Sequence, residues 1–180
     1  MSPSQPVTRK MKATTVKKPA AQLVLGVRLA SRTLVRELGF LGKHLAGTNL
    51  TPSQVHALLE LERFPATQAA DLCHVLRLDK STVSRLLADL VKRGYIRSAV
   101  ARTDGRQRML SIPAKGRLQL AAIHRAATRQ FIAALEVLEE PQWESTLAGV
   151  QLLANALAAT RTARGQGVAR VSRRPNRATR

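Results

Sequence analysis

The sequence has 180 residues, a length that favours one compact domain with tails. Thirty Lys and Arg against eleven Asp and Glu give a formal net charge of +19, which favours a polyanionic partner. Aromatic residues make up only 3%, which argues against stacking on single-stranded bases and leaves double-stranded nucleic acid as the first candidate, ahead of an anionic membrane.

Both ends of the chain are purely basic, because all acidic residues lie between Glu37 and Glu144. Residues 1–22 carry five basic residues and residues 160–180 carry seven, so we predict two disordered basic arms around one domain at residues 23–159. Residues 77–108 hold most of the positive charge that is left in this domain. Specific binding of a polyanion is therefore expected there.

Three helices are predicted in the first part of the domain. Apolar residues at spacings of three and four indicate one long amphipathic helix over about residues 22–46, which Gly47 ends. Thr51 before a proline is typical of a helix start and predicts a helix over residues 52–62. Thr67 is the next candidate N-cap, for a short helix that runs through residue 76.

The next predicted helix begins after Asp79, whose carboxylate can accept the free amide hydrogens of the first turn. Its apolar period covers residues 80–93, and Gly94 is placed to end it in the left-handed conformation. Residues 95–100 and 108–112 then read as two short strands around an Asp-Gly turn.

The helical period returns from about residue 114 to 138, and Pro141 opens a last helix. The fold class is therefore mainly α with a small β-hairpin wing. Two short helices followed by a hairpin form the layout of a winged helix-turn-helix, at about residues 51–113.

The helix at residues 80–93 has the two faces that a DNA-recognition helix needs. Its inner face is apolar, and its outer face offers small or forked polar side chains to base edges, namely Lys80, Ser81, Thr82, Ser84 and Arg85. An ordinary solvated helix face is the alternative interpretation of this pattern. We also place Thr67 and Gln68, at the start of the preceding helix, among the candidate DNA contacts.

The predicted wing favours the DNA-binding interpretation. Arg102, Arg106 and Arg108 have the charge and reach to enter a minor groove, where the negative potential attracts arginine. Asp104 can orient Arg106 through a charge-assisted hydrogen bond. A plain polar turn would not need three arginines within seven residues.

Several of these segments resemble the MarR family of bacterial transcriptional regulators. They are LTPSQVHALL at 50–59, LDKSTVSRL at 78–86, GYIR at 94–97, DGR at 104–106 and IPAKG at 112–116, where Pro113 stands in place of the usual threonine. The resemblance covers about residues 23–158. Residues 31–41 also look like the regulatory half of MarR-type proteins that are fused to an acetyltransferase, although this chain ends before such a domain.

The resemblance implies a homodimer in which the helices at about residues 22–46 and 114–159 form a shared helical base. The apolar stripes of these long helices support a dimer independently, because one winged module offers too little surface to bury them. Two recognition helices one helical turn apart would read a pseudo-palindromic operator. Family members often hold small aromatic effectors at the junction of base and DNA-binding module, so Phe40, His44 and His56 are candidate effector contacts, with surface or capping histidines as the alternative.

No catalytic residue, cofactor or metal site is predicted. The histidines never occur at the spacing of a helical metal pair, and the Gly-x-Gly at 165–167 has no strand before it. The single cysteine, Cys73, excludes a disulfide framework and fits a reducing cytoplasm. We assign it to packing, with thiol sensing as the alternative. No apolar run is long enough to span a bilayer.

We therefore expect a cytoplasmic, sequence-specific, dimeric regulator that binds double-stranded DNA, more often a repressor, with a small-molecule effector as a further possibility. The first alternative is a nucleoid-type protein that coats DNA without strong sequence choice. The second is a regulatory partner of an acetyltransferase.

Overall fold

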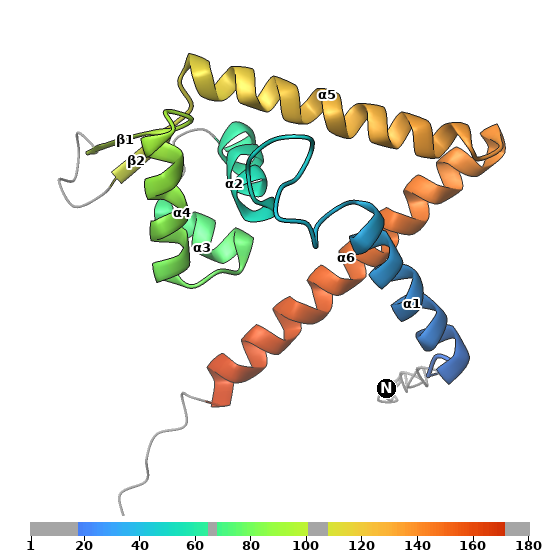
Figure 1. Ribbon diagram of the computed structural model, residues 1–180. Coiled ribbons are helices and arrows are strands. Elements are labelled where there is room, and N and C mark those ends of the chain that lie inside the picture. The colour runs from blue at the N-terminus through green and yellow to red at the C-terminus, as the bar shows by residue number, and fades with distance from the viewer. Residues whose placement is uncertain (1–17, 65–67, 101–107, 172–180) are drawn as a thin grey trace, which may run out of the picture. The chain divides into compact units, whose positions relative to one another are not determined.

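The protein is described by a computed structural model that covers residues 18–64, 68–100 and 108–171. The elements follow the predicted order (Figure 1). They are α1 (Ala21–Glu37), α2 (Pro52–Arg63), α3 (Ala69–Leu76), α4 (Lys80–Lys92), β1 (Arg97–Val100), β2 (Arg108–Ser111), α5 (Ala114–Glu136) and α6 (Glu140–Val171). The prediction of a mainly helical fold with a two-stranded hairpin is confirmed.

Helix α2 begins as the sequence predicts. The Thr51 hydroxyl accepts a hydrogen bond from the Gln54 amide at 3.3 Å, and the Gln54 side-chain oxygen accepts one from the Thr51 amide at 2.9 Å. This reciprocal pair forms a capping box, and Pro52 occupies the first helical position.

Helix α1 is shorter than predicted. It ends at Glu37 instead of continuing to residue 46, because Gly39 adopts a positive φ of 80°. A turn follows, in which the Thr48 hydroxyl donates to the Leu45 carbonyl at 2.7 Å and accepts from the Leu50 amide at 3.1 Å. Leu41, within the range predicted to be helical, lies in this segment and is 76% exposed.

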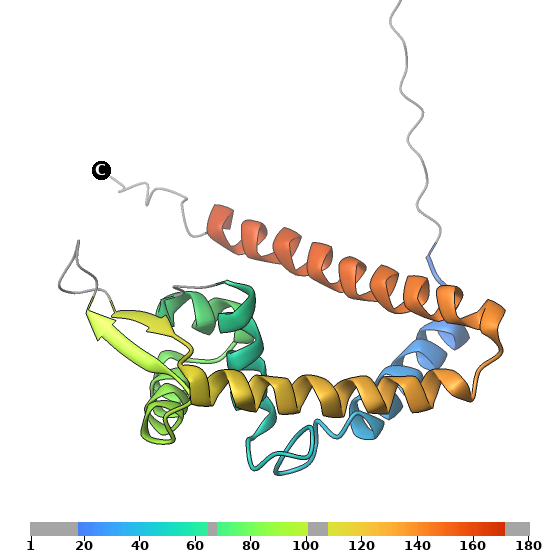
Figure 2. The same ribbon diagram turned by 90° about the horizontal axis from the view of Figure 1, so that it is seen from above.

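The hydrophobic core lies within residues 50–123. Helices α2, α3 and α4 contact one another, and α3 also contacts β2. Figures 1 and 2 show these three helices gathered beside the hairpin. The largest fully buried side chains are Leu50, Val55, Leu58, Leu72, Val83, Leu90, Ile96 and Ile123. Each contributes roughly 1.5–3 kcal/mol by leaving water, and the burial of Val83 and Leu90 fixes α4 on the core.

The hairpin is antiparallel and pairs Arg97 with Ser111 and Val100 with Arg108. Its strands are shorter than predicted, because the chain after α4 first folds back on that helix. Gly94 has the expected positive φ of 74°, and the Tyr95 amide donates to the Leu90 carbonyl at 3.0 Å. This reversal sets where the wing begins.

The chain divides into two compact units, residues 1–117 and 118–180, with the boundary inside α5. In the second unit the Trp143 indole N–H donates to the Leu135 carbonyl at 2.8 Å, which ties α6 to the end of α5. Helix α6 continues to Val171. Residues 160–171, predicted to be a disordered arm, are therefore helical, while residues 1–17 and 172–180 lie outside the described chain.

Candidate nucleic-acid interface

Helix α4 has the two faces that its sequence predicts. Val83, Leu86, Leu87 and Leu90 are buried, whereas Lys80, Ser81, Ser84 and Arg85 are exposed and Thr82 is half-buried. The exposed polar residues lie in the first turns of the helix. The amide groups at a helix N-terminus also favour a nearby phosphate, so this end of α4 combines base-reading groups with an attraction for the DNA backbone.

The N-terminus of α4 is held by Asp79, as predicted. One carboxylate oxygen accepts from the Thr82 amide at 2.9 Å and from the Ser81 hydroxyl at 2.6 Å. The other accepts from the Thr82 hydroxyl at 2.6 Å. The hydrogen bonds from Ser81 and then Thr82 hold the pKa of Asp79 well below its usual range, because they stabilise the ionised form.

The turn between α3 and α4 contains an unusual backbone conformation. Arg77 has φ 56° and ψ 40°, in the left-handed region that side chains with a Cβ rarely adopt. The Leu78 amide donates to the Cys73 carbonyl at 3.2 Å and closes the turn. An arginine at this position costs about 1 kcal/mol relative to glycine.

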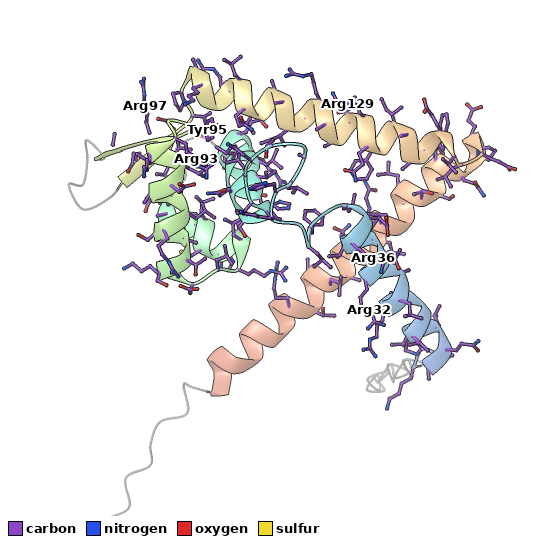
Figure 3. All side chains as sticks on the ribbon, in the orientation of Figure 1. Arg32, Arg36, Arg93, Tyr95, Arg97 and Arg129 are labelled. Carbon is purple, nitrogen blue, oxygen red and sulfur yellow. The ribbon has the colours of Figure 1, made fainter. Side chains whose placement is uncertain are left out.

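The C-terminal half of α4 is anchored by a polar network that sequence reasoning missed. One Asp89 oxygen accepts from the Gln54 side-chain amide at 2.6 Å and from Arg93 Nε at 2.7 Å. Arg93 Nη1 also donates to the Asn49 carbonyl at 3.2 Å. Figure 3 shows Arg93 near Tyr95, where α4 leads into β1. Arg93, which belongs to the positively charged segment 77–108, thus holds the fold together through Asp89 and the Asn49 carbonyl.

The start of α3 differs from the prediction. Its N-cap is Gln68, whose amide donates to the Asp71 carboxylate at 3.1 Å, and Gln68 also forms a bridge with Met109 of the hairpin. Thr67, the predicted N-cap, lies outside the described residues. The α3 N-terminus is therefore linked to the base of the wing.

The wing tip, with Arg102, Asp104 and Arg106, also lies outside the described residues. Arg108 begins β2 opposite Val100. The structure thus places the start of the wing, and the predicted roles of its arginines stay predictions.

A cavity of about 610 Å³ lies between α3, α4 and the hairpin. Cys73, half-buried and free of any disulfide, is part of its lining. The wall also includes Lys80, Ser84, Lys92 and Leu110. Periodicity did not reveal this cavity, because its walls come from three separate elements.

The structure brings together two of the three predicted effector contacts. The rings of Phe40 and His56 stack with centroids 5.4 Å apart and planes 27° apart. His56 also lines a cavity of about 340 Å³, together with Glu60 and Arg77. His44 is exposed, and no ring contact joins it to the pair in the described part of the chain.

In residues 18–64, 68–100 and 108–171, no group of three or more His, Cys, Asp or Glu could hold a metal ion. None of the helices in these ranges has both the length and the apolarity that a membrane-spanning helix needs.

Comparison with known proteins shows similarity to one family of regulators. Residues 48–107 match the MarR family. A probable transcriptional regulator from Pseudomonas aeruginosa is 29% identical, with 76% of this chain and 97% of that chain covered and a TM-score of 0.57. PcaV from Streptomyces coelicolor, solved with its natural ligand, is 18% identical, with 78% and 99% covered and a TM-score of 0.59. A search of curated proteins found no match.

A MepR mutant from S. aureus, solved bound to an oligodeoxyribonucleotide, has the same fold at 18% identity, with 77% and 99% covered and a TM-score of 0.50. Residues 48–107 of the chain are thus similar to the MarR family, and the described elements form a winged-helix fold like that of these solved regulators. These similarities support a DNA-binding transcriptional regulator.

Proposed function

We propose that this regulator is a homodimeric, sequence-specific repressor that reads a pseudo-palindromic operator. The observation that carries the proposal is that α4 has one buried apolar face and one exposed polar face. A buried apolar face fixes the helix on the core, and an exposed polar face at its N-terminal end offers Lys80, Ser81, Ser84 and Arg85 to the major groove.

The other proposed DNA contacts surround this face. Thr82 belongs to the first turn of α4, and Thr67 and Gln68 belong to the start of α3. In the wing, Arg102, Arg106 and Arg108 would enter the minor groove, and Asp104 would orient Arg106. The basic ends of the chain would add affinity without sequence choice, because they release counterions from the phosphates.

A dimer is supported by the apolar side chains that α1 and α6 leave exposed. Helix α1 has no buried residue, and every described side chain from residue 140 to 157 of α6 is exposed. Leu147, Leu152 and Leu157 are 58%, 73% and 61% exposed. Leucines in such numbers on a surface mark an interface, and a second copy would bury them.

The specificity claim is tested by competition binding at fixed salt, with an operator selected from genomic fragments against random duplex DNA. Arg85→Ala should cost about 1–3 kcal/mol on the operator and much less on random DNA, because arginine grips guanine through two hydrogen bonds. Arg129→Ala, a matched change on an exposed residue of α5, should leave the ratio of operator affinity to random-DNA affinity unchanged. Equal losses on both DNAs for Arg85→Ala would contradict the proposal.

The dimer is tested by dilution. Trp143 is the only tryptophan, lies in α6 and is 41% exposed in the single chain. Its emission should shift to longer wavelength as the dimer dissociates, in parallel with the mass measured by analytical ultracentrifugation. Leu147→Asp should give the diluted spectrum and the monomer mass at all concentrations.

The proposal also includes a small aromatic effector. The stacked Phe40 and His56 pair and the cavity beside His56 support one site, while the larger cavity beside α4 offers another. Thermal-shift screening with aromatic carboxylates would separate them. His56→Ala should abolish binding at the first site, and Ala88→Leu should abolish it at the second.

DNA coating without sequence choice remains the second candidate, because the basic chain ends suit it. A ratio near one between operator and random DNA in the same competition assay would favour it.

A further inference from the structure

The hydroxyl groups of Ser81 and Thr82 have a fixed hydrogen-bonding direction. Both lie 2.6 Å from a carboxylate oxygen of Asp79. A hydroxyl carries one proton and two lone pairs, whereas an ionised carboxylate has no proton to give. Since the pKa of Asp79 lies well below its usual range, this carboxylate is ionised near neutral pH. Both hydroxyls must therefore donate to Asp79.

A hydroxyl whose proton is already donated can only accept further hydrogen bonds. Ser81 is exposed and Thr82 is half-buried, so the remaining lone pairs of Ser81 are available to a partner. In the major groove the donors are the amino groups of adenine N6 and cytosine N4, while thymine O4 and guanine O6 and N7 are acceptors. An acceptor-only serine can therefore pair with adenine or cytosine but not with the carbonyl edge of thymine or guanine.

From this geometry we infer that Asp79 is a positioning residue for DNA specificity, which makes Ser81 require an adenine or cytosine amino group in the operator. The inference rests on the proposed sequence-specific function and assigns Asp79 a role beyond capping α4. It also gives the outer face of α4 a direction. The Ser81 hydroxyl accepts hydrogen bonds from base edges, and the Arg85 guanidinium only donates them.

Ser84 provides an internal contrast. It is exposed on the same helix, and no hydrogen bond fixes its hydroxyl within the described residues. Its hydroxyl can rotate to donate or to accept. Ser84 should therefore tolerate both kinds of base edge, whereas Ser81 should not.

Two substitutions of Asp79 separate the hydroxyl effect from the loss of charge. Asn and Ser are N-caps of about the same quality as Asp, so both should keep the helix. Asp79→Asn keeps the oxygen that accepts from Ser81 and from the Thr82 amide, so Ser81 remains an acceptor. Asp79→Ser is too short to hold the Ser81 hydroxyl while capping the helix, so Ser81 becomes free to donate. Both variants lose the same negative charge.

The experiment begins with duplexes that the full-length protein recovers from a random library. The base that Ser81 reaches is the position at which Ser81→Ala loses discrimination. A consensus duplex is then made in which this base lacks its amino group, with purine in place of adenine or 2-pyrimidinone in place of cytosine. Relative Kd values are measured at one salt concentration for the wild type and for each variant.

We expect removal of the amino group to weaken binding roughly fivefold to tenfold for the wild type and for Asp79→Asn. The loss should be less than about twofold for Ser81→Ala and Asp79→Ser, because neither needs an amino partner. The comparison of the wild type with Ser81→Ala suffices if Asp79→Ser does not fold, as judged by circular dichroism.

Two results would overturn the inference alone: a thymine or guanine required at the Ser81 position, or the same loss for Ser81→Ala as for the wild type. Recovery of duplexes without any shared sequence would instead overturn the proposed function, and the inference with it.

Discussion

The winged module and the terminal helices use the same apolar residue types in opposite ways. Leu90 in α4 is fully buried, whereas Leu152 in α6 is 73% exposed. Among the described residues, the buried hydrophobic side chains lie between Leu50 and Ile123, and α1 has none. The difference teaches that one chain completes the DNA-reading module by itself, while its terminal helices carry apolar surface that the proposed second copy would bury.

Truncation of one leucine in each region would test this contrast most strongly. Leu90→Ala should destabilise the protein by about 2–5 kcal/mol at every protein concentration, because it leaves a cavity inside one chain. Leu147→Ala should cost less, and its cost should depend on protein concentration if a partner covers that side chain. Urea unfolding over a wide concentration range measures both. A concentration-independent cost for Leu147→Ala would break the comparison.

Gly116 tests how tightly the module is closed at the start of α5. A Cβ at this position would overlap the Tyr95 carbonyl oxygen and approach Ile112 Cγ2 to 2.7 Å. We expect Gly116→Ala to cost about 1–3 kcal/mol in chemical denaturation, because backbone atoms must move. Lys115→Ala, at the exposed neighbouring position, should change stability by less than about 0.5 kcal/mol. Similar values for the two changes would contradict this close approach.

The module also contains a local weakness at Arg77, in the left-handed conformation. Arg77→Gly should raise the stability by up to about 1 kcal/mol, because glycine adopts this conformation without steric cost. Arg77→Ala keeps the Cβ and should give no such gain. Melting temperatures of the three proteins at equal concentration provide the measurement, and a lower value for the glycine variant would refute the prediction.

The smallest expected effect concerns acid. The pKa of Asp79 is lowered in the folded protein, so its cap contributes fully above the ordinary carboxyl pKa of about 4 and is lost as pH falls toward the lowered value. The stability difference between the wild type and Asp79→Ala should therefore be constant from about pH 7 to 5 and shrink below about pH 4. A difference that persists unchanged at pH 2.5 would show that the carboxylate is not involved.

The sequence predicted α4 well because cap, period and C-terminal glycine agree there. Asp79, the apolar spacing and Gly94 all indicate the same helix, and the structure has it. Helix α1 was predicted too long because its apolar spacing continues through a glycine. The positive φ of Gly39 ends the helix at Glu37, and the spacing of apolar residues does not reveal the backbone conformation of a glycine.

For the candidate site, the sequence predicted which residues of α4 are exposed but not the hydrogen bonds among their side chains. The outer residues of α4 follow from the helical period, which places Ser81 and Arg85 on the exposed side. The engagement of Arg93 by Asp89, and that of the Ser81 hydroxyl by Asp79, depend on side-chain geometry. A charge count treats Arg93 as free for DNA, whereas the network with Gln54 commits it to the fold.

That network has a consequence for how operator preference can change over time. Asp89 and Arg93 fasten the last turns of α4 to α2 and to the loop before α2, and Val83 packs its first turns in the core, so the exposed side chains of the first turns are not needed to hold the helix in place. Substitutions at Ser84 and Arg85 can then alter the bases that are read while the fold is retained. A gene duplicate could acquire a new set of target promoters through a few changes at one end of a single helix.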